Sequence, residues 1–209
     1  KIADQAHELV AVQYSTYNRS LLPQMKLAGL EAVTEHERMT EQQKQYADKY
    51  FEENVYPVLT PMAMDPSRPF PLVRNKTLNI GALISKKGEK GKAEFATVQV
   101  PSVLPRIVEL PPSESGQKCV ILLEQLIERN IDKLFLNYDV VCAHPYRIMR
   151  NADLSYDEDE AADLLKEIQK QLKKRQWGEV IRLEIEEKMH PKLLKILKSE
   201  FQVKEEDIY

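Results

Sequence analysis

Four histidines are the first residues to test for chemistry, because an imidazole can bind a metal, move a proton or carry a phosphoryl group. They are His7, His36, His144 and His190. None of them lies at metal-ligand spacing from another histidine or from a cysteine. The run His190-Pro191-Lys192 matches the first half of an HxKxxxxD phosphotransfer pattern, but Leu197 occupies the position of the acid. The sequence therefore predicts no catalytic residue and no metal site.

A lysine- and glycine-rich run, KKGEKGK at residues 86–92, could be mistaken for a phosphate-binding loop. A Walker A loop needs four residues between its glycines and a Ser or Thr after the lysine. Here two residues separate Gly88 from Gly91, and Ala93 follows Lys92. The run is typical of a solvated hairpin turn.

Five cations lie at the predicted beginnings and ends of strands, where side chains from different segments can converge. They are Arg68, Arg74, Lys76, Arg147 and Arg150. Arginine forks suit phosphate oxygens, so these residues are candidates for binding a polyanion. The alternatives are scattered surface charge, or pairing of Arg147 or Arg150 with Asp153 or with the acidic run 157–160.

The elements that must position these cations are read from periodicity. Residues 2–22 predict an amphipathic helix that ends or kinks at Leu22-Pro23, and Gly29 is a plausible stop for the turn that follows. Residues 30–33 suit a short strand. Thr40 opens the capping-box pattern T-E-Q-Q of a second helix, which runs to about residue 56.

The stretch 56–79 holds five of the chain's twelve prolines, so it cannot be helical, nor a central strand before Thr77. Apolar residues interleave these prolines, and we expect the segment to be packed down and ordered rather than a loose linker.

Strands are predicted at 78–84 and 93–100 as a hairpin, and then at 107–110, 118–122, 138–150 and 179–187. Pro145 favours an edge position or a bulge in the long strand. Ile181, Leu183 and Ile185 are expected to point inward. Helices are predicted at 120–128, 157–175 and 191–199. This order favours an α+β fold, a mostly antiparallel sheet flanked by helices with an N-terminal helical segment.

The composition of the chain argues against several classes of protein. The chain has 209 residues, 43% apolar content and a net charge of −3, a balance that argues against a general nucleic-acid binder. It carries no run long enough to span a bilayer and no secretory signal pattern. With only Cys119 and Cys142, reduced thiols and a cytoplasmic location are expected. The chain opens on Lys1 inside a helical pattern, as a piece of something longer would.

Several runs together resemble bacterial polyphosphate kinase of the histidine-phosphorylating type. They are ELVAVQYSTYNRSLLPQMKLAGL, YFEENVYPVLTPMAMDPSRPFPLVRNKTLN, VPSVLPR, YRIMRNADL and the closing EEDIY. The resemblance covers nearly the whole chain, and residues 56–71 are its most specific part. It implies an enzyme that reversibly transfers the terminal phosphate of ATP to polyphosphate, with ATP and Mg²⁺ used by the full-length protein and a phosphohistidine carried by C-terminal domains.

The resemblance also implies how the segment is divided. Residues 1–29 correspond to the helical end of an N-terminal domain and residues 30–209 to the head, or middle, domain. The head domain is associated with dimer contacts and with the polyphosphate channel, and this segment alone is expected to be inactive and to bind no cofactor. The alternative is a freestanding phosphate- or nucleotide-binding module. The first hypothesis requires roughly 450 or more further residues downstream, by the size of the added domains.

Within this resemblance, four cations are the expected polyphosphate-binding residues: Arg74, Lys76, Arg147 and Arg150. Arg74 and Lys76 precede one predicted strand, while Arg147 and Arg150 end another. If the two strands are antiparallel neighbours, the start of one meets the end of the other and the four charges cluster.

Overall fold

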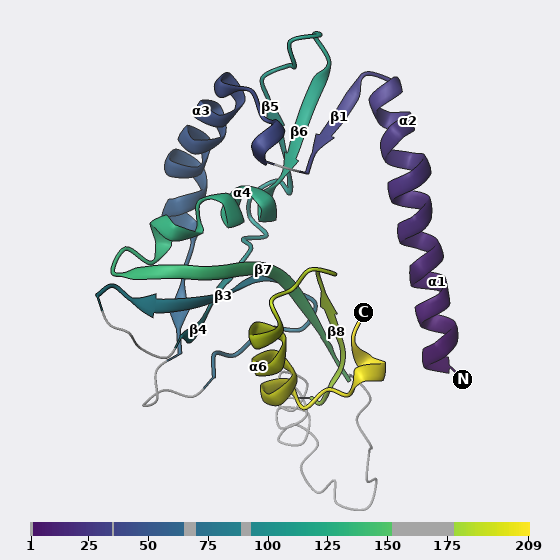
Figure 1. The fold of residues 1–209 in the computed structure, drawn as a ribbon, viewed down its shortest axis with the longest axis vertical. Coiled ribbons are helices and arrows are strands. Elements are labelled where there is room, and N and C mark those ends of the chain that lie inside the picture. Colours follow the sequence, from purple (N-terminus) through teal and green to yellow (C-terminus); the bar gives the residue numbers. More distant parts are fainter. Residues whose placement is uncertain (1, 35, 65–69, 89–92, 152–177) are drawn as a thin grey trace, which may run out of the picture.

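Two β-sheets and the helices around them form the fold of this computed structural model, which describes residues 2–34, 36–64, 70–88, 93–151 and 178–209 (Figure 1). The predicted α+β class is confirmed, with helices against a mostly antiparallel sheet. The predicted helix at 157–175, Arg68 and part of the 86–92 turn lie outside the described residues.

The larger sheet has five strands in the order β2-β4-β3-β7-β8, and each neighbouring pair is antiparallel. Its strands are β2 (Met62–Ala63), β3 (Leu78–Lys86), β4 (Glu94–Gln99), β7 (Tyr138–Arg150) and β8 (Val180–Ile185). The predicted hairpin and long strand are thus present, and β3 lies between β4 and β7. Most of β3 is buried on both faces, so it reads as an apolar run rather than a clean alternation.

The smaller sheet has three strands in the order β1-β6-β5. They are β1 (Leu30–Val33), β5 (Ile107–Leu110) and β6 (Lys118–Leu122), all close to their predicted positions. Strands β5 and β6 pair antiparallel, whereas β1 pairs parallel to β6. The parallel pair is the one departure from an antiparallel arrangement among the described strands.

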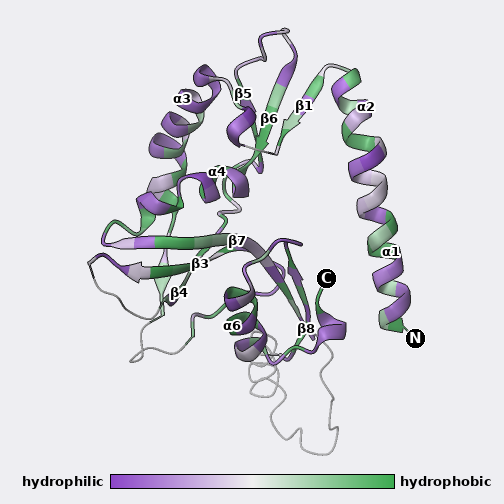
Figure 2. Ribbon diagram, viewed as in Figure 1, coloured by the Kyte–Doolittle hydropathy of each residue, from purple (hydrophilic) through white to green (hydrophobic). Residues whose placement is uncertain are grey.

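Two separate apolar cores cover the two faces of the five-stranded sheet. The first lies under α3 (Glu41–Tyr50), α4 (Leu123–Arg129) and the three-stranded sheet, and includes Phe51, Ile80 and Leu126. The second lies under α6 (Pro191–Phe201) and includes Leu83, Leu183 and Leu193. Figure 2 shows the apolar colour along β3 and β7, where these layers meet.

The N-terminal helix continues past Pro23, so of the two predicted outcomes, an end or a kink at Leu22-Pro23, the end is wrong. Helix α1 (Ile2–Thr16) passes through a π-helical turn, η1 (Tyr17–Leu21), into α2 (Leu22–Leu27). In that turn the Leu22 N–H donates to the Tyr17 carbonyl, and the wider turn directly precedes the residue that lacks a donor. Gly29 then takes a left-handed conformation, φ 88°, as expected for a helix stop.

The second helix begins as predicted. Thr40 Oγ1 accepts from the Gln43 N–H at 3.2 Å, and Gln43 Oε1 accepts from the Thr40 N–H at 3.0 Å, which completes the capping box. After α3 the chain continues through a π turn, η3 (Phe51–Val55), and a 3-10 turn, η4 (Tyr56–Val58). Pro57 lies inside that last turn, at the helix end that the sequence predicts.

The proline-rich stretch is packed down only in part. Val73 is buried, and Leu59, Met64 and Phe70 pack against the two cores. Leu72, by contrast, is exposed. Residues 65–69 lie outside the described part of the chain.

Two strand details differ from expectation. Strand β7 is not at the edge of its sheet, but its ladder with β8 starts at Tyr146, so Pro145 has a strand neighbour only on the β3 side. Ile181 points outward, against prediction, because a bulge in the β7–β8 ladder skips it. Val180 and Leu183 are the buried residues of β8.

The remaining described helices are short: η2 (His36–Arg38), η5 (Ile131–Leu134) and η7 (Glu205–Asp207). A search of the described residues finds no helix with the length and apolar content needed to cross a membrane.

Candidate functional site: a cationic patch at the junction of two strands

The start of β3 and the end of β7 meet, which brings the four predicted cations to one junction. Leu78 is the register partner of Arg147, and the Ile148 carbonyl accepts from the Lys76 N–H at 2.9 Å. The Arg150 N–H in turn donates to Asn75 Oδ1 at 2.9 Å. We call Arg74, Lys76, Arg147 and Arg150 the cationic patch. The register of β3 against β7 confirms the assumption that the two strands are antiparallel neighbours.

The approach to β3 is a tight turn that sets the direction of its cations. Thr77 Oγ1 donates to the Arg74 carbonyl at 2.9 Å, and Lys76 has a left-handed backbone with φ 62°. Such a backbone is uncommon for a residue with a side chain, and here the Ile148 carbonyl holds it through the Lys76 N–H. The turn leaves both the Arg74 and Lys76 side chains exposed.

Arg147 is not a free charge. Its Nε donates to Glu184 Oε2 at 2.5 Å, and Arg182 Nε donates to Glu184 Oε1 at 2.9 Å. One carboxylate therefore lies between two guanidinium groups, and the trio has a net charge of +1. The Arg182 guanidinium also lies 3.8 Å above the ring of Tyr209, at the end of the chain.

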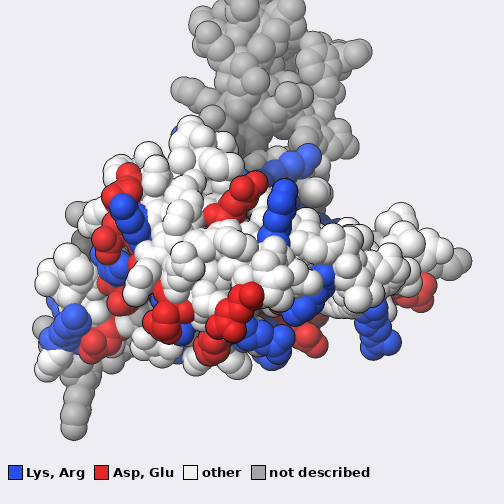
Figure 3. All heavy atoms as spheres, turned by 90° about the horizontal axis from the view of Figure 1, so that it is seen from above, with Lys and Arg blue, Asp and Glu red and all other residues white. Residues whose placement is uncertain are grey.

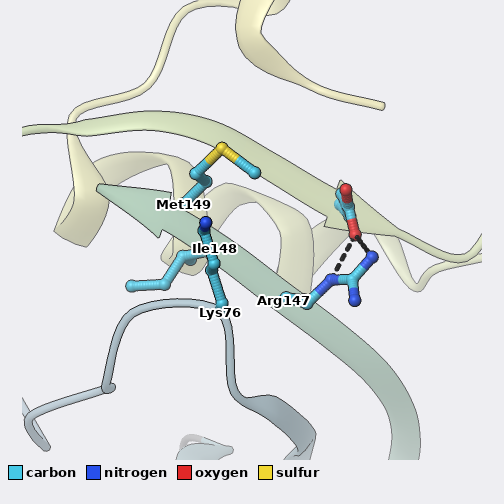
Figure 4. Close-up of a pocket in the computed structure, with 5 residues that line it drawn as sticks. Lys76, Arg147, Ile148 and Met149 are labelled. Atoms are coloured by element: carbon cyan, nitrogen blue, oxygen red, sulfur yellow. Dashed lines mark hydrogen bonds and ion pairs between the residues drawn. The ribbon is translucent and has the colours of Figure 1, made fainter. Parts of the chain in front are cut away.

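A small pocket of about 180 Å³ opens beside this pair (Figure 4). Its lining consists of Lys76, Arg147, Ile148, Met149 and Glu184. In Figure 4 the Lys76 side chain extends along Ile148 toward Met149, while the Arg147 guanidinium turns the other way to its carboxylate partner. Polar groups thus lie at both ends of a short apolar floor.

Lys76 and Arg74 are the cations of the patch whose side chains have neither an ion pair nor a hydrogen bond within the described residues. Exposed unpaired cations keep their hydration and are available to an incoming anion. This distinguishes them from Arg147, whose charge is shared with Glu184.

Arg150 has a different environment from the other three. Its Nη1 donates to the Gly178 carbonyl at 2.8 Å and its Nη2 to the Val73 carbonyl at 3.3 Å, while its buried Nε has no hydrogen-bond partner among the described residues. Burial lowers the pKa of this guanidinium from its ordinary value. Arg150 therefore links the proline-rich stretch to the segment that precedes β8.

The structure gives the ion-pair partner of Arg147, for which the sequence had suggested Asp153 or the acidic run 157–160. Arg147 pairs with Glu184, a residue that sequence reasoning did not consider. Asp153 and the acidic run 157–160 lie outside the described residues. Arg182 and Glu184 could have been found from the sequence, because they alternate with Leu183 on the outward face of a predicted strand.

The face of the molecule seen from above carries charges of both signs. Figure 3 shows Lys and Arg interleaved with Asp and Glu across this face. A face of this kind offers an anion a few placed cations rather than a broad positive potential.

The histidine of the partial phosphotransfer pattern has a local role. His190 Nδ1 accepts from the Lys192 N–H at 3.2 Å, so the imidazole caps the first turn of α6. The three residues that resemble a phosphotransfer motif form a helix start.

Comparison with known proteins identifies the family of the chain. Residues 42–209 match the family model described as polyphosphate kinase middle domain. The chain belongs to the polyphosphate kinase family.

Individual relatives agree with this. The chain is 44% identical to a polyphosphate kinase of Bacillus anthracis over 100% of its own length and 30% of that protein. It is 47% identical to one of Lactiplantibacillus plantarum over 90% of its length and 26% of that protein. The crystal structure of polyphosphate kinase from Porphyromonas gingivalis matches the whole chain and 30% of its own, with a TM-score of 0.76 at 22% identity, which shows a shared fold. The chain spans about a third of the length of these proteins.

Proposed function

We propose that this chain is the non-catalytic head domain of a polyphosphate kinase, residues 30–209, preceded by the helical end of an N-terminal domain, residues 1–29. The full-length enzyme would transfer the terminal phosphate of ATP to polyphosphate reversibly, with ATP and Mg²⁺ bound outside this segment. The observation that carries the proposal is the match of residues 42–209 to the family's middle domain. It favours this function over a freestanding phosphate- or nucleotide-binding module.

Within the enzyme, the cationic patch would contact polyphosphate. The polymer carries about one negative charge per internal unit, so fixed cations can hold it without reading a sequence, as phosphate contacts do for nucleic acids. Lys76 and Arg74 are exposed, and Lys76 lines a pocket with an apolar floor. They would make the direct contacts.

Arg147 and Arg150 would contribute in other ways. A phosphate oxygen near Arg147 competes with Glu184 for the guanidinium, so its net contribution is smaller than that of an unpaired cation. Arg150 would act through the backbone, because its donors already hold Gly178 and Val73. It keeps the turn that carries Lys76 in place.

The test is polyphosphate affinity of the full-length enzyme as a function of salt. Arg74→Ala with Lys76→Ala should weaken binding and reduce the slope of log affinity against log salt by roughly 1 to 2, about one for each lost phosphate contact. Lys118→Ala is the matched control, since this exposed lysine lies on the three-stranded sheet. Unchanged affinity and slope in the double variant would contradict the proposal.

A second test concerns the covalent intermediate. After incubation of the full-length enzyme with labelled ATP, peptide mapping should find the phosphohistidine outside this segment. The failed HxKxxxxD pattern and the capping role of His190 support this expectation. Stable label on any of the four histidines would overturn the non-catalytic assignment.

The family resemblance also leads us to propose a homodimeric, phosphohistidine-bearing, cytoplasmic enzyme. Support for further protein contacts comes from the helical run of α1, η1 and α2, where large apolar side chains remain exposed; they include Ile2, Leu9, Val12, Leu21 and Leu27. Support for a reducing location comes from the cysteines, which are both free and belong to different sheets.

A further inference from the structure

Three side chains from separate elements bring metal-binding atoms together. One of them, His144, precedes Pro145 in β7, whereas Arg147 and Arg150 of the cationic patch follow it. Glu128 comes from the last turn of α4, His144 from β7, and Glu186 from the residue after β8. One ligand atom of each lies within 4.8 Å of the others, and His144 Nδ1 donates to Glu186 Oε2 at 2.8 Å. Sequence spacing could not reveal this group, because 42 residues separate the last two.

We propose that Glu128, His144 and Glu186 form a binding site for a divalent transition-metal ion, with Zn²⁺ the best match. One imidazole nitrogen with two carboxylate oxygens is a donor set that Zn²⁺ accepts, whereas Mg²⁺ and Ca²⁺ prefer oxygen alone. Three protein ligands leave a position for water. The proposal does not depend on the function proposed above.

The distances suit one ion. At metal–donor bonds of about 2.1 Å, donors around a tetrahedral ion lie roughly 3.4 Å apart. The hydrogen-bonded pair is closer than this and all three donor atoms lie within 4.8 Å of one another, so an ion would need to move each of them only slightly. An ion would replace the proton that His144 and Glu186 share.

The fold leaves this position accessible. The ladder between β7 and β8 ends at the pair Tyr146 and Ile185, so His144 and Glu186 lie just past the paired region. The His144 side chain is 16% exposed and that of Glu186 46% exposed. The first supplies a restrained ligand, and the second lies at the solvent entrance.

The local charge balance favours a cation. Neither Glu128 nor Glu186 pairs with a Lys or Arg side chain in the described part of the chain, and Glu128 has no hydrogen-bond partner there. Burial, together with the charge of Glu186, raises the pKa of Glu128 to about 7. The two carboxylates repel each other when both are charged. A divalent ion bound between them would offset this repulsion.

The test counts metal bound per chain in the full-length protein after chelator treatment and dialysis against Zn²⁺. His144→Ala and Glu128→Gln should each bind one equivalent less than the unaltered protein. Glu187→Gln is the matched control, because this neighbouring exposed carboxylate is not part of the group. Equal metal content in the unaltered protein and both site variants would overturn the proposal.

A spectroscopic readout makes the result independent of activity and of other metal sites. Co²⁺ in place of Zn²⁺ should give visible absorption bands that lose one equivalent of intensity in His144→Ala. Should that variant fold poorly, Glu128→Gln preserves side-chain shape, and Zn²⁺ should raise the melting temperature of the unaltered protein more than that of Glu128→Gln. Identical Co²⁺ spectra and identical Zn²⁺ shifts in all variants would contradict a site here.

Discussion

Two cations of the patch, Arg150 and Lys76, show how burial separates structural from ligand-binding roles. Arg150 donates to two backbone carbonyls, and its burial lowers its pKa. Lys76 is exposed and without an ion pair in the described residues. From the sequence alone, both residues were predicted to bind polyphosphate because of their charge and position. Their surroundings support a structural role for Arg150 and, as proposed, anion binding by Lys76.

This difference predicts opposite effects on stability. Arg150→Ala should lower the free energy of unfolding by about 1–3 kcal/mol, because the Gly178 and Val73 carbonyls lose a charged donor. Lys76→Ala should change it by no more than about 0.5 kcal/mol, as for an ordinary surface substitution. Urea unfolding of the two variants is the measurement. Equal losses would show that Arg150 has no special structural role.

His36 gives the chain a pH dependence with a definite sign. Burial, with the charge of Arg129 adding to it, lowers the pKa of His36 from its ordinary value of 6.5, while Glu37 and Asp48 partly oppose the shift. The unfolded chain therefore binds the proton more readily than the folded one. The folded state should lose stability as the pH falls through about 6.5 toward the lowered value.

The measurement is the urea midpoint at pH 7.5 and pH 5.5 for the unaltered chain and for His36→Gln. The variant should show the smaller drop between the two pH values, since its side chain does not titrate. A larger drop of the urea midpoint in His36→Gln would mean that protonation of His36 stabilises the folded state, contrary to this prediction.

At the scale of elements, the bulge in β8 decides which apolar side chains form the core. The register passes from Met149–Arg182 to Arg150–Val180 and skips Ile181. Strict alternation would have buried 181, 183 and 185. The bulge instead places Val180 and Leu183 inside and leaves Ile181 43% exposed.

Substitutions in β8 should follow the bulge and not the alternation. Leu183→Ala should cost about 2–5 kcal/mol of unfolding free energy, because Leu183 is fully buried in the second core. Ile181→Thr should cost less than about 1 kcal/mol, since its side chain keeps much of its contact with water and Thr retains the branching that strands favour. The measurement is chemical unfolding. Similar losses of unfolding free energy in the two variants would contradict the effect of the bulge and support a strict alternation of buried and exposed residues along β8.

At the scale of the whole molecule, the two ends of the chain meet (Figure 1). His7 Nε2 donates to the Glu206 carbonyl at 3.0 Å, and its ring stacks on Tyr209 with centroids 4.1 Å apart. Tyr209 lies under Arg182, whose carboxylate partner Glu184 also holds Arg147. A continuous set of contacts thus connects the N-terminal helix to the cationic patch.

Loss of this contact should loosen both ends. His7→Ala removes one hydrogen bond and one ring stack, worth about 1–2 kcal/mol together, so amide exchange in 205–209 and in the first turns of α1 should accelerate by roughly 5- to 30-fold. Glu8→Ala is the control, because Glu8 is the exposed neighbour. Equal exchange in the two variants would mean that the contacts of His7 with Glu206 and Tyr209 do not hold the two segments together.

Local sequence patterns determined most elements of this protein, because they act over a few residues. The capping box at Thr40, the stop at Gly29 and the 78–100 hairpin follow from side-chain chemistry within one turn or one strand. The sequence also indicated that the start of β3 would meet the end of β7 if the two strands were antiparallel neighbours, and the structure supplies that pairing. The resemblance to polyphosphate kinases rested on short runs and also needed no coordinates.

Tertiary structure alone decided what depends on long-range register and burial. The parallel pairing of β1 with β6 and the bulge at Ile181 both depend on how separate segments pack. The sharing of Glu184 between two arginines needs β7 beside β8. The group of Glu128, His144 and Glu186 needs three elements at once. Spacing along the sequence does not predict such contacts, because residues that are far apart in the sequence can lie close together in the folded protein.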